Sequence, residues 1–542
     1  MDMVLGRFSL GNQSQIPRNP TMKVSSKLIA GLLVAVLCAG SAMAEVRTWT
    51  DSKGRQVVAS FVQMEGENIV LKTEDGVLHK FPLTMLSSED QAIAKASKPQ
   101  APTATAAAPA GPKATNPAVA AAADQIDRLV ANGIKRANPT RAKMGKEPIT
   151  SFNALANDEQ FVRRIYLDIA GRIPNYDETK AFLADANPQK RSVLIDQLLD
   201  TEGYNQHMFN YLSEMLRVKS DFDQALVRGN DYVAWLKEQV AANRPWNEMV
   251  YEMLTATGKM WDKKPDGSSN GAAGYLLRDS GMPLDNLANT LTVFLGTDVA
   301  CAQCHDHPFA DWTQMQFYEL AAFFGATSTR MGRGMGNENL MPEIEKIVTK
   351  SGQDIQRLRN GINNYIGANR YVIQDTDKNM LRIPHDYQYK DARPGDEVRP
   401  KFVMWSSADK SNPAYKQNKS NEEGLRASFA SWLTHPENPR FAMTIANRMW
   451  KRAFGAGIAE PVTNIDDPEL STNPELLKHL ASEMKRLKFN LKEFTRIILN
   501  TRAYQSEATT ENIAMGEPYY FQGPMLRRMT AEQAWDSYMT MV

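Results

Sequence analysis

Apolar residues recur at helical spacing through most of the chain. Phe161, Ile165 and Ile169 follow one another at intervals of four residues, and Gly171 and Pro174 end the pattern. Because an α-helix makes one turn in about 3.6 residues, this spacing places the three side chains on one helix face. The same layout returns in "KRSVLIDQLLD", "PRFAMTIANRMWKRAFG" and "NLKEFTRIILN", with no run typical of a buried strand among them. We therefore expect a mainly α multidomain body from residue 124 onwards.

The hydrophobic pattern is different between residues 45 and 97. Short apolar stretches at Val57 to Val62, Asn68 to Leu71 and Val77 to Phe81 are separated by glycine-containing turns. Such short runs between turns are typical of antiparallel strands. The polar run from Ser87 to Asp90 is typical of a helix cap ahead of Gln91 to Ala96. We expect a small all-β meander or barrel that is followed by one short helix.

Two segments interrupt these patterns. Residues 98–123 consist mainly of Ala, Pro and Thr, which cannot bury enough apolar surface to fold, so we expect a linker. The stretch from Lys390 to Asn421 is rich in Lys, Asp, Pro and Ser and separates two helical regions. These regions are predicted as one domain over residues 124–389 and another over residues 422–542.

From Met22 the chain has the layout of a secretory signal. Lys23 and Lys27 precede an apolar run from Leu28 to Ala39, and a small-x-small triplet ends at Ala44. We expect residues 1–44 to form a signal region whose true start is Met22 and which is cleaved after Ala44. The run is too short for a comfortable span, so we expect no transmembrane helix after cleavage. Export to the periplasm, the cell surface or the medium follows.

The charge balance excludes one class of function. The chain has 63 Lys and Arg residues against 62 Asp and Glu residues, a net charge of +1. Binding to nucleic acid through bulk charge needs a positive excess, because neutralised phosphates supply most of the affinity. We therefore expect no nucleic-acid partner.

The cysteines mark the candidate chemistry. Cys38 lies in the signal region, which leaves Cys301 and Cys304 in a C-x-x-C-H motif that ends at His305. This motif is the attachment signature of c-type haem. Two thiols about one turn apart can add to the haem vinyl groups, while the neighbouring imidazole reaches the iron. Export agrees with haem c, since covalent haem attachment takes place outside the bacterial cytoplasm.

Other chemistry stays open at this motif. The two thiols with His305 or His307 could bind Zn or Fe instead. The cysteines could also form a dithiol redox pair or a structural disulfide. Asp306 could orient a histidine ring as a hydrogen-bond acceptor, or it could be a solvated carboxylate of the loop. The candidates for a second axial haem ligand are Met331, Met335, Met341 and His385.

Basic and aromatic side chains outside the motif have two interpretations each. The arginines at 448, 452, 527 and 528 could clamp an anion such as a haem propionate, or they could form salt bridges between the helical domains. The aromatic residues from Trp312 to Phe324 could form a wall of a haem crevice or an ordinary helix core.

Long motifs in the chain resemble known families. "FVRRIYLDIAGRIPNYDETKAFLAD" and "FLGTDVACAQCHDHPFADWTQMQFYELAAFF" resemble the planctomycete-type cytochrome-c-like family, domain of unknown function 1549. "LRASFASWLTHPENPRFAMTIANRMWKRAFG" and "GPMLRRMTAEQAWDS" are similar to its companion, domain of unknown function 1553, which normally continues beyond the point matched by Val542. "GENIVLKTEDG" and "FPLTMLSSEDQ" resemble the SLA-one homology domain, an SH3-like module.

The resemblance implies exported proteins of planctomycetes and verrucomicrobia that hold haem c through Cys301, Cys304 and His305. It also implies a redox partner, or a cell-surface or polysaccharide-associated protein. We therefore expect an exported haem c protein with a single site, for electron transfer or an undefined redox reaction. The alternative is a cell-surface binding or scaffold protein with structural Zn or Fe at the same motif. Whether the chain is an enzyme stays open.

Overall fold

The computed structural model describes two stretches of the chain. They are residues 46–96, apart from 66–67 and 74–77, and residues 114–542, apart from 223–226, 280–281, most of 330–370, 377–380, 406–412, 416–423, 466, 512 and 514–515. The chain divides into two compact units at the junction between Ala108 and Pro109. The predicted signal region and most of the predicted linker lie outside the described residues.

The N-terminal unit is a four-stranded antiparallel sheet with one helix. Strands β1 (Val46–Thr50), β2 (Gln56–Glu65), β3 (Asn68–Thr73) and β4 (Leu78–Pro82) pair in chain order, and a 3₁₀ turn, η1 (Leu83–Met85), leads to α1 (Ser88–Ala96). A bridge between Asp51 and Leu86 links the two ends of the sheet. The small β region and its closing helix are confirmed.

Trp49 lies at the centre of this unit. Its ring is buried among the apolar side chains of the sheet and α1, and its indole N–H donates to the Ala59 carbonyl at 3.0 Å. Arg47 pairs with Asp90 at 2.7 Å, and the same carboxylate accepts the Thr50 backbone N–H at 2.6 Å. These contacts fasten α1 to β1, because Asp90 belongs to the first turn of that helix.

The second unit is helical. Its α-helices are α2 (Pro117–Lys143), α3 (Asp158–Ala170), α4 (Tyr176–Ala184), α5 (Lys190–Leu199), α6 (Glu202–Met215), α7 (Asn230–Ala241), α8 (Trp246–Thr255), α9 (Gly274–Leu277), α10 (Pro283–Leu295), α11 (Gln314–Ala321), α14 (Gly424–Thr434), α15 (Phe441–Phe454), α16 (Pro474–Arg486), α17 (Leu491–Leu499), α18 (Arg502–Gln505) and α19 (Ala531–Met541). Short 3₁₀ helices are η2 (Gly271–Ala273), η3 (Ala300–Gln303), η4 (Ala322–Phe324), η5 (Pro413–Tyr415) and η6 (Pro468–Leu470). Two two-stranded ribbons pair β5 (Asp221–Phe222) with β6 (Val227–Arg228) and β7 (Thr327–Ser328) with β8 (Gln374–Asp375). The mainly α body is confirmed.

The first long helix begins inside the predicted linker. Asn116 caps α2 by accepting the Ala118 N–H, and Pro117 occupies the first helical position, where its missing N–H has no helical partner to lose. Val119 and Ala123 of the alanine-rich run are buried in the core. The prediction that the linker extends to residue 123 is therefore wrong at its end, because alanine favours a helix once a cap and a packing surface are present.

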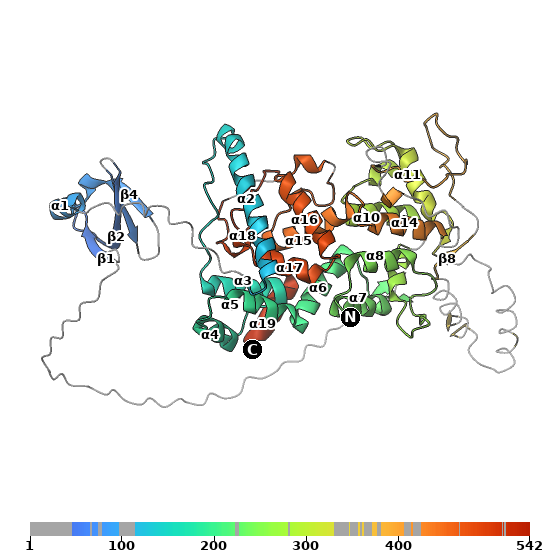
Figure 1. The fold of residues 1–542 in the computed structure, drawn as a ribbon, viewed down its shortest axis with the longest axis horizontal. Coiled ribbons are helices and arrows are strands. Elements are labelled where there is room, and N and C mark those ends of the chain that lie inside the picture. Colours follow the sequence, from blue (N-terminus) through green and yellow to red (C-terminus); the bar gives the residue numbers. More distant parts are fainter. Residues whose placement is uncertain are drawn as a thin grey trace, which may run out of the picture. The chain divides into compact units, whose positions relative to one another are not determined.

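The two helical regions predicted as separate domains share one hydrophobic core. In Figure 1 the orange helices α15 and α16 lie between α2, in cyan, and α10. Trp450 of α15 is 0% exposed, and its ring stacks on Phe454 at a centroid distance of 4.0 Å. Phe521 meets the same indole edge-on at 5.3 Å. The helical regions on either side of the predicted domain boundary therefore pack into one core and do not form two separate ones.

Hydrogen bonds and ion pairs join the same regions. Arg164 on α3 donates from Nη1 to the carbonyls of Tyr504, at 2.6 Å, and Ser506, at 2.7 Å. Arg527 pairs with Asp168 at 2.8 Å, and Asp168 also accepts the Tyr504 hydroxyl. Arg527 thus forms the salt bridge between helical regions that the sequence suggested. Among the described residues, no helix has the length and apolar character needed to cross a bilayer.

Truncation of Trp450 tests the shared core. Trp450→Ala is expected to lower the free energy of unfolding by about 3 to 5 kcal/mol, because it leaves a cavity between buried aromatic rings. Trp535→Ala is the matched control, since Trp535 on α19 is 67% exposed, and it should change stability by no more than about 0.5 kcal/mol. Urea unfolding followed by far-UV circular dichroism measures both. Equal effects of the two substitutions would contradict the shared core.

Asp127 on α2 makes stability depend on pH. Its carboxylate accepts the backbone N–H groups of Arg502, at 2.7 Å, and Ala503, at 3.0 Å. Burial outweighs these bonds and raises the pKa of Asp127 to about 6. The native state therefore binds this proton more tightly than the unfolded state, so the contribution of Asp127 to stability becomes less favourable as pH rises from about 4 to about 6.

Asp127→Asn is expected to remove this contribution to the pH dependence. Relative to the variant, the unsubstituted chain should lose roughly 2 kcal/mol of unfolding free energy between about pH 4 and about pH 7. Urea titrations across that range measure the difference. Asp311→Asn, at an exposed position, is the control and should follow the unsubstituted chain. Parallel pH profiles of the chain and Asp127→Asn would refute the assignment.

Candidate functional site

The C-x-x-C-H motif forms a tight turn after α10. The turn is the 3₁₀ helix η3, in which the Cys301 carbonyl accepts the N–H groups of Cys304, at 3.2 Å, and His305, at 3.3 Å. Ala302 between the cysteines is 0% exposed, and it anchors the turn in the core. Both thiols are free and exposed. The turn therefore presents two unbonded thiols to solvent, with His305, itself exposed, directly after them.

The Nδ1 atoms of His305 and His307 have opposite roles in their hydrogen bonds. Nδ1 of His305 lies 2.7 Å from the Asp306 carbonyl oxygen, which can only accept, so Nδ1 carries the proton. In a neutral imidazole this leaves the Nε2 lone pair free for a metal. Nδ1 of His307 instead accepts the Phe309 backbone N–H at 3.2 Å, so the proton of a neutral ring is on Nε2. His305 is therefore prepared to act as a ligand, and His307 is a turn residue.

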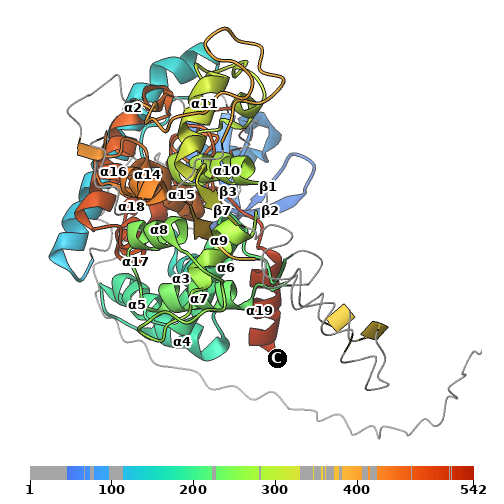
Figure 2. The same ribbon diagram turned by 90° about the vertical axis from the view of Figure 1, so that its right-hand side faces the viewer.

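Asp306 has a different role from the predicted one. Among the described residues its carboxylate has no hydrogen bond to a histidine ring, and Oδ1 accepts the Gln314 N–H at 2.8 Å in the first turn of α11. The backbone carbonyl of Asp306 makes the contact with His305 instead. Its N–H donates to the Tyr389 hydroxyl at 2.7 Å, and this residue lies 83 positions away in the chain. Figure 2 shows α11 beside α10, the helix that leads into the motif.

The aromatic residues after the motif belong mostly to the core. Phe323 stacks on Phe402 at a centroid distance of 4.4 Å, and Phe324 meets Phe429 at 5.0 Å. Tyr318 on α11 is also buried. Burial raises the pKa of its hydroxyl, and the nearby Cys304 and Asp386 side chains raise it further. The interpretation of these rings as an ordinary helix core is thus supported for most of them.

Phe309 is the exception among the aromatic residues near the motif. Its side chain is 93% exposed, and its ring meets the His307 ring edge-on at a centroid distance of 6.5 Å. An apolar ring this exposed is uncommon in a folded chain, so Phe309 offers apolar surface next to the motif.

The structure does not bring the alternative metal ligands together. Within the described part of the chain, no three His, Cys, Asp or Glu side chains are grouped closely enough to hold a metal ion. Cys301, Cys304, His305 and His307 therefore do not form a converged ligand set. Of the candidates for a second axial haem ligand, Met331, Met335 and Met341 lie outside the described residues, and His385 is exposed.

Three family models match the chain. Residues 140–329 match a protein of unknown function (DUF1549), and residues 425–542 match a second protein of unknown function (DUF1553). Residues 39–100 match SLA1 homology domain 1 (SHD1). The chain combines an SHD1, a DUF1549 and a DUF1553 region, in that order. No curated protein matches it, and neither does any solved structure.

The motif lies in the DUF1549 region, and the DUF1553 region holds the corner before it. The carbonyl of Gly296, which ends α10 with a φ of 57°, accepts the Ile465 N–H at 2.6 Å. Arg448 on α15 donates to the Thr292 carbonyl at 3.1 Å. Tyr389 lies between the two matched regions. Sequence analysis missed Tyr389, because its role depends on a contact with Asp306 that no local pattern encodes.

Thiol labelling tests the geometry of the motif. In the native, haem-free chain a maleimide reagent is expected to modify both Cys301 and Cys304, because both side chains are exposed and free. Mass spectrometry of a proteolytic digest locates the labels. Prior treatment with a phosphine reductant should leave the extent of labelling unchanged. Labelling that appears only after reduction would show a disulfide, and labelling that appears only after denaturation would show burial.

Proposed function

We propose that this chain is an exported c-type haem protein in which Cys301, Cys304 and His305 hold a single haem. The observation that carries the proposal is the pairing of two exposed, free thiols with an imidazole whose Nε2 is free. The family matches agree with a cytochrome-like type of protein. We propose that this haem serves electron transfer or an undefined redox reaction.

The motif fits covalent attachment of haem. Each thiol can add its S–H across one vinyl double bond, which forms a thioether and releases nothing. The exposure of Cys301 and Cys304 means that no core side chain has to move for this step. His305 would hold the iron through Nε2, since its Nδ1 proton is already bound by the Asp306 carbonyl. The bound haem would supply a one-electron iron couple.

The position of the motif favours exchange of electrons with a partner. Cys301, Cys304, His305 and Phe309 are all exposed, so a redox partner can approach a haem at this turn closely. Export belongs to the same proposal, because the layout of residues 22–44 is that of a secretory signal and covalent haem attachment occurs outside the cytoplasm. We propose a periplasmic or cell-surface location, with a redox or surface-associated partner.

Expression in a host that matures c-type cytochromes tests the proposal. The exported chain should carry covalent haem that survives denaturing electrophoresis, and it should show a sharp visible α-band on reduction. Cys301→Ala or Cys304→Ala should lose most of this haem, and the double variant should lose all of it. His305→Ala should change the visible spectrum of the attached haem, whereas His307→Ala is the matched control and should retain both haem and spectrum.

A colourless chain would sink the proposal, provided that a reference c-type cytochrome made in the same cells carries haem. Elemental analysis of that colourless chain separates the remaining possibilities. One zinc or iron atom per chain, lost in Cys301→Ala, would support a structural metal site instead.

A further inference from the structure

Asp306 is held at three separate atoms. Its N–H donates to the Tyr389 hydroxyl at 2.7 Å, and its Oδ1 accepts the Gln314 N–H at 2.8 Å. Its carbonyl oxygen lies 2.7 Å from Nδ1 of His305. Because peptide groups are planar, the first two contacts limit how Asp306 can turn about its own φ and ψ. The carbonyl that binds His305 shares its peptide group with the His307 N–H, which donates to the Trp312 carbonyl at 2.7 Å. The direction of this carbonyl is therefore restrained by Asp306 on one side and by His307 on the other.

An exposed histidine on a surface turn needs such a restraint. The side chain of His305 is exposed on this turn, and its ring has a hydrogen bond to the Asp306 carbonyl. A neutral imidazole can carry its proton on either nitrogen, and only the Nδ1–H tautomer leaves Nε2 free. A carbonyl fixed at hydrogen-bond distance from Nδ1 favours that tautomer. If the carbonyl were not fixed, the His305 ring could turn and its proton could move to Nε2.

Tyr389 is itself firmly placed. Its ring packs edge-on against Tyr387 at a centroid distance of 5.3 Å, and Tyr387 is buried. The Tyr387 hydroxyl donates to Asp391 at 2.6 Å, and this bond spans Tyr389 in the chain. A further contact attaches the same segment to α11, since Lys401 N–H donates to the Glu319 carbonyl at 3.1 Å. The Tyr389 hydroxyl is thus a fixed acceptor delivered to the motif by a distant part of the chain.

We propose that Tyr389 is a positioning residue which, through Asp306, keeps His305 in the Nδ1–H tautomer with Nε2 free for axial ligation. The value of this arrangement for haem rests on the proposed function, whereas the tautomer itself is a property of the haem-free chain. Tyr389 touches neither His305 nor the thiols in the contacts described above, and it acts on the ligand through the Asp306 peptide.

The haem-free chain tests the proposal directly. Nitrogen NMR of the full chain with ¹⁵N-labelled histidine, at about pH 8.5 where an ordinary imidazole is neutral, reports which ring nitrogen is protonated. H305Q identifies the His305 signals. In the unsubstituted chain His305 should be mainly the Nδ1–H tautomer and His307 the Nε2–H tautomer. Tyr389→Phe keeps the ring but removes the acceptor, and it should shift His305 towards the Nε2–H tautomer while His307 stays unchanged.

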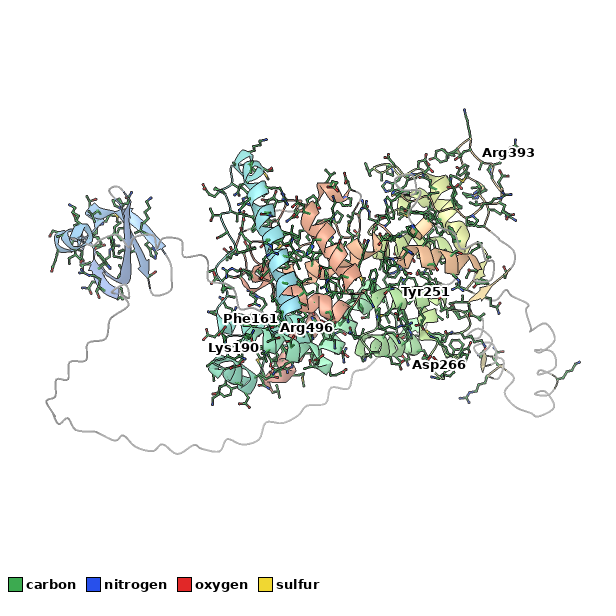
Figure 3. The ribbon with its side chains drawn as sticks, viewed as in Figure 1. Phe161, Lys190, Tyr251, Asp266, Arg393 and Arg496 are labelled. Carbon is green, nitrogen blue, oxygen red and sulfur yellow. The ribbon has the colours of Figure 1, made fainter. Side chains whose placement is uncertain are left out.

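Two further variants sharpen this test. Asp306→Ala loosens the same residue from the α11 side and should shift the His305 tautomer in the same direction. Tyr251→Phe removes a hydroxyl from α8 (Figure 3) and should leave both histidines unchanged. Folding of each variant is checked by circular dichroism. An unchanged His305 tautomer in folded Tyr389→Phe and Asp306→Ala would overturn the proposal, whether or not the chain takes up haem.

The haem-loaded chain supplies a second readout. Tyr389→Phe should retain covalent haem, since both thiols are untouched, but its reduction potential should shift to more positive values. The reason is that a hydrogen bond from Nδ1–H makes the imidazole a stronger electron donor, which stabilises the oxidised iron. Tyr251→Phe should show the unsubstituted potential. Retained haem with an unshifted potential in Tyr389→Phe would count against the proposal but not against haem binding.

Discussion

The burial of α15 is the constraint on which the helical unit depends. Most of this helix is buried, including Phe441, Ala446 and Phe454 at different points around its axis. A helix that is buried on nearly all sides must be surrounded by other elements. Its neighbours come from both family regions, with α10 from DUF1549 and α16 and α17 from DUF1553. Neither region can bury α15 alone, so the two regions form one unit although their sequence families are distinct.

Packing between the two family regions also fixes the backbone just before the C-x-x-C-H motif. The corner between α10 and η3 passes Gly296, where a Cβ atom would lie 3.1 Å from Ile465 and Thr444 side-chain atoms and the φ is left-handed. Glycine is therefore the residue that fits this corner. The hydrogen bond from Ile465 then ties the corner to the DUF1553 region. The C-x-x-C-H motif is thus exposed to a large ligand, while the corner before it is held in place by buried residues.

Local patterns predicted much of the fold and little of the support around the site. Helices α3, α15 and α17 follow from apolar spacing and from end signals such as Gly171, which act within one or two turns. The motif itself is also local. Tyr389 was missed because its contact with Asp306 depends on how two distant segments pack. The start of α2 was misplaced because composition alone does not show that an alanine-rich segment packs against the rest of the chain. In the structure Val119 is buried there.

Residue type and spacing leave both His305 and His307 as possible ligands of Zn or Fe, and the backbone separates them. Pro308 follows His307 and Pro436 follows His435, and in both places Nδ1 accepts the N–H two residues further on. In each turn the histidine serves as an acceptor for the backbone, which removes Nδ1 from metal chemistry. His305 has no proline after it, and its ring meets a carbonyl instead. Which histidine can bind a metal is therefore decided by the hydrogen bond at the opposite nitrogen, and that bond depends on how Asp306 is held.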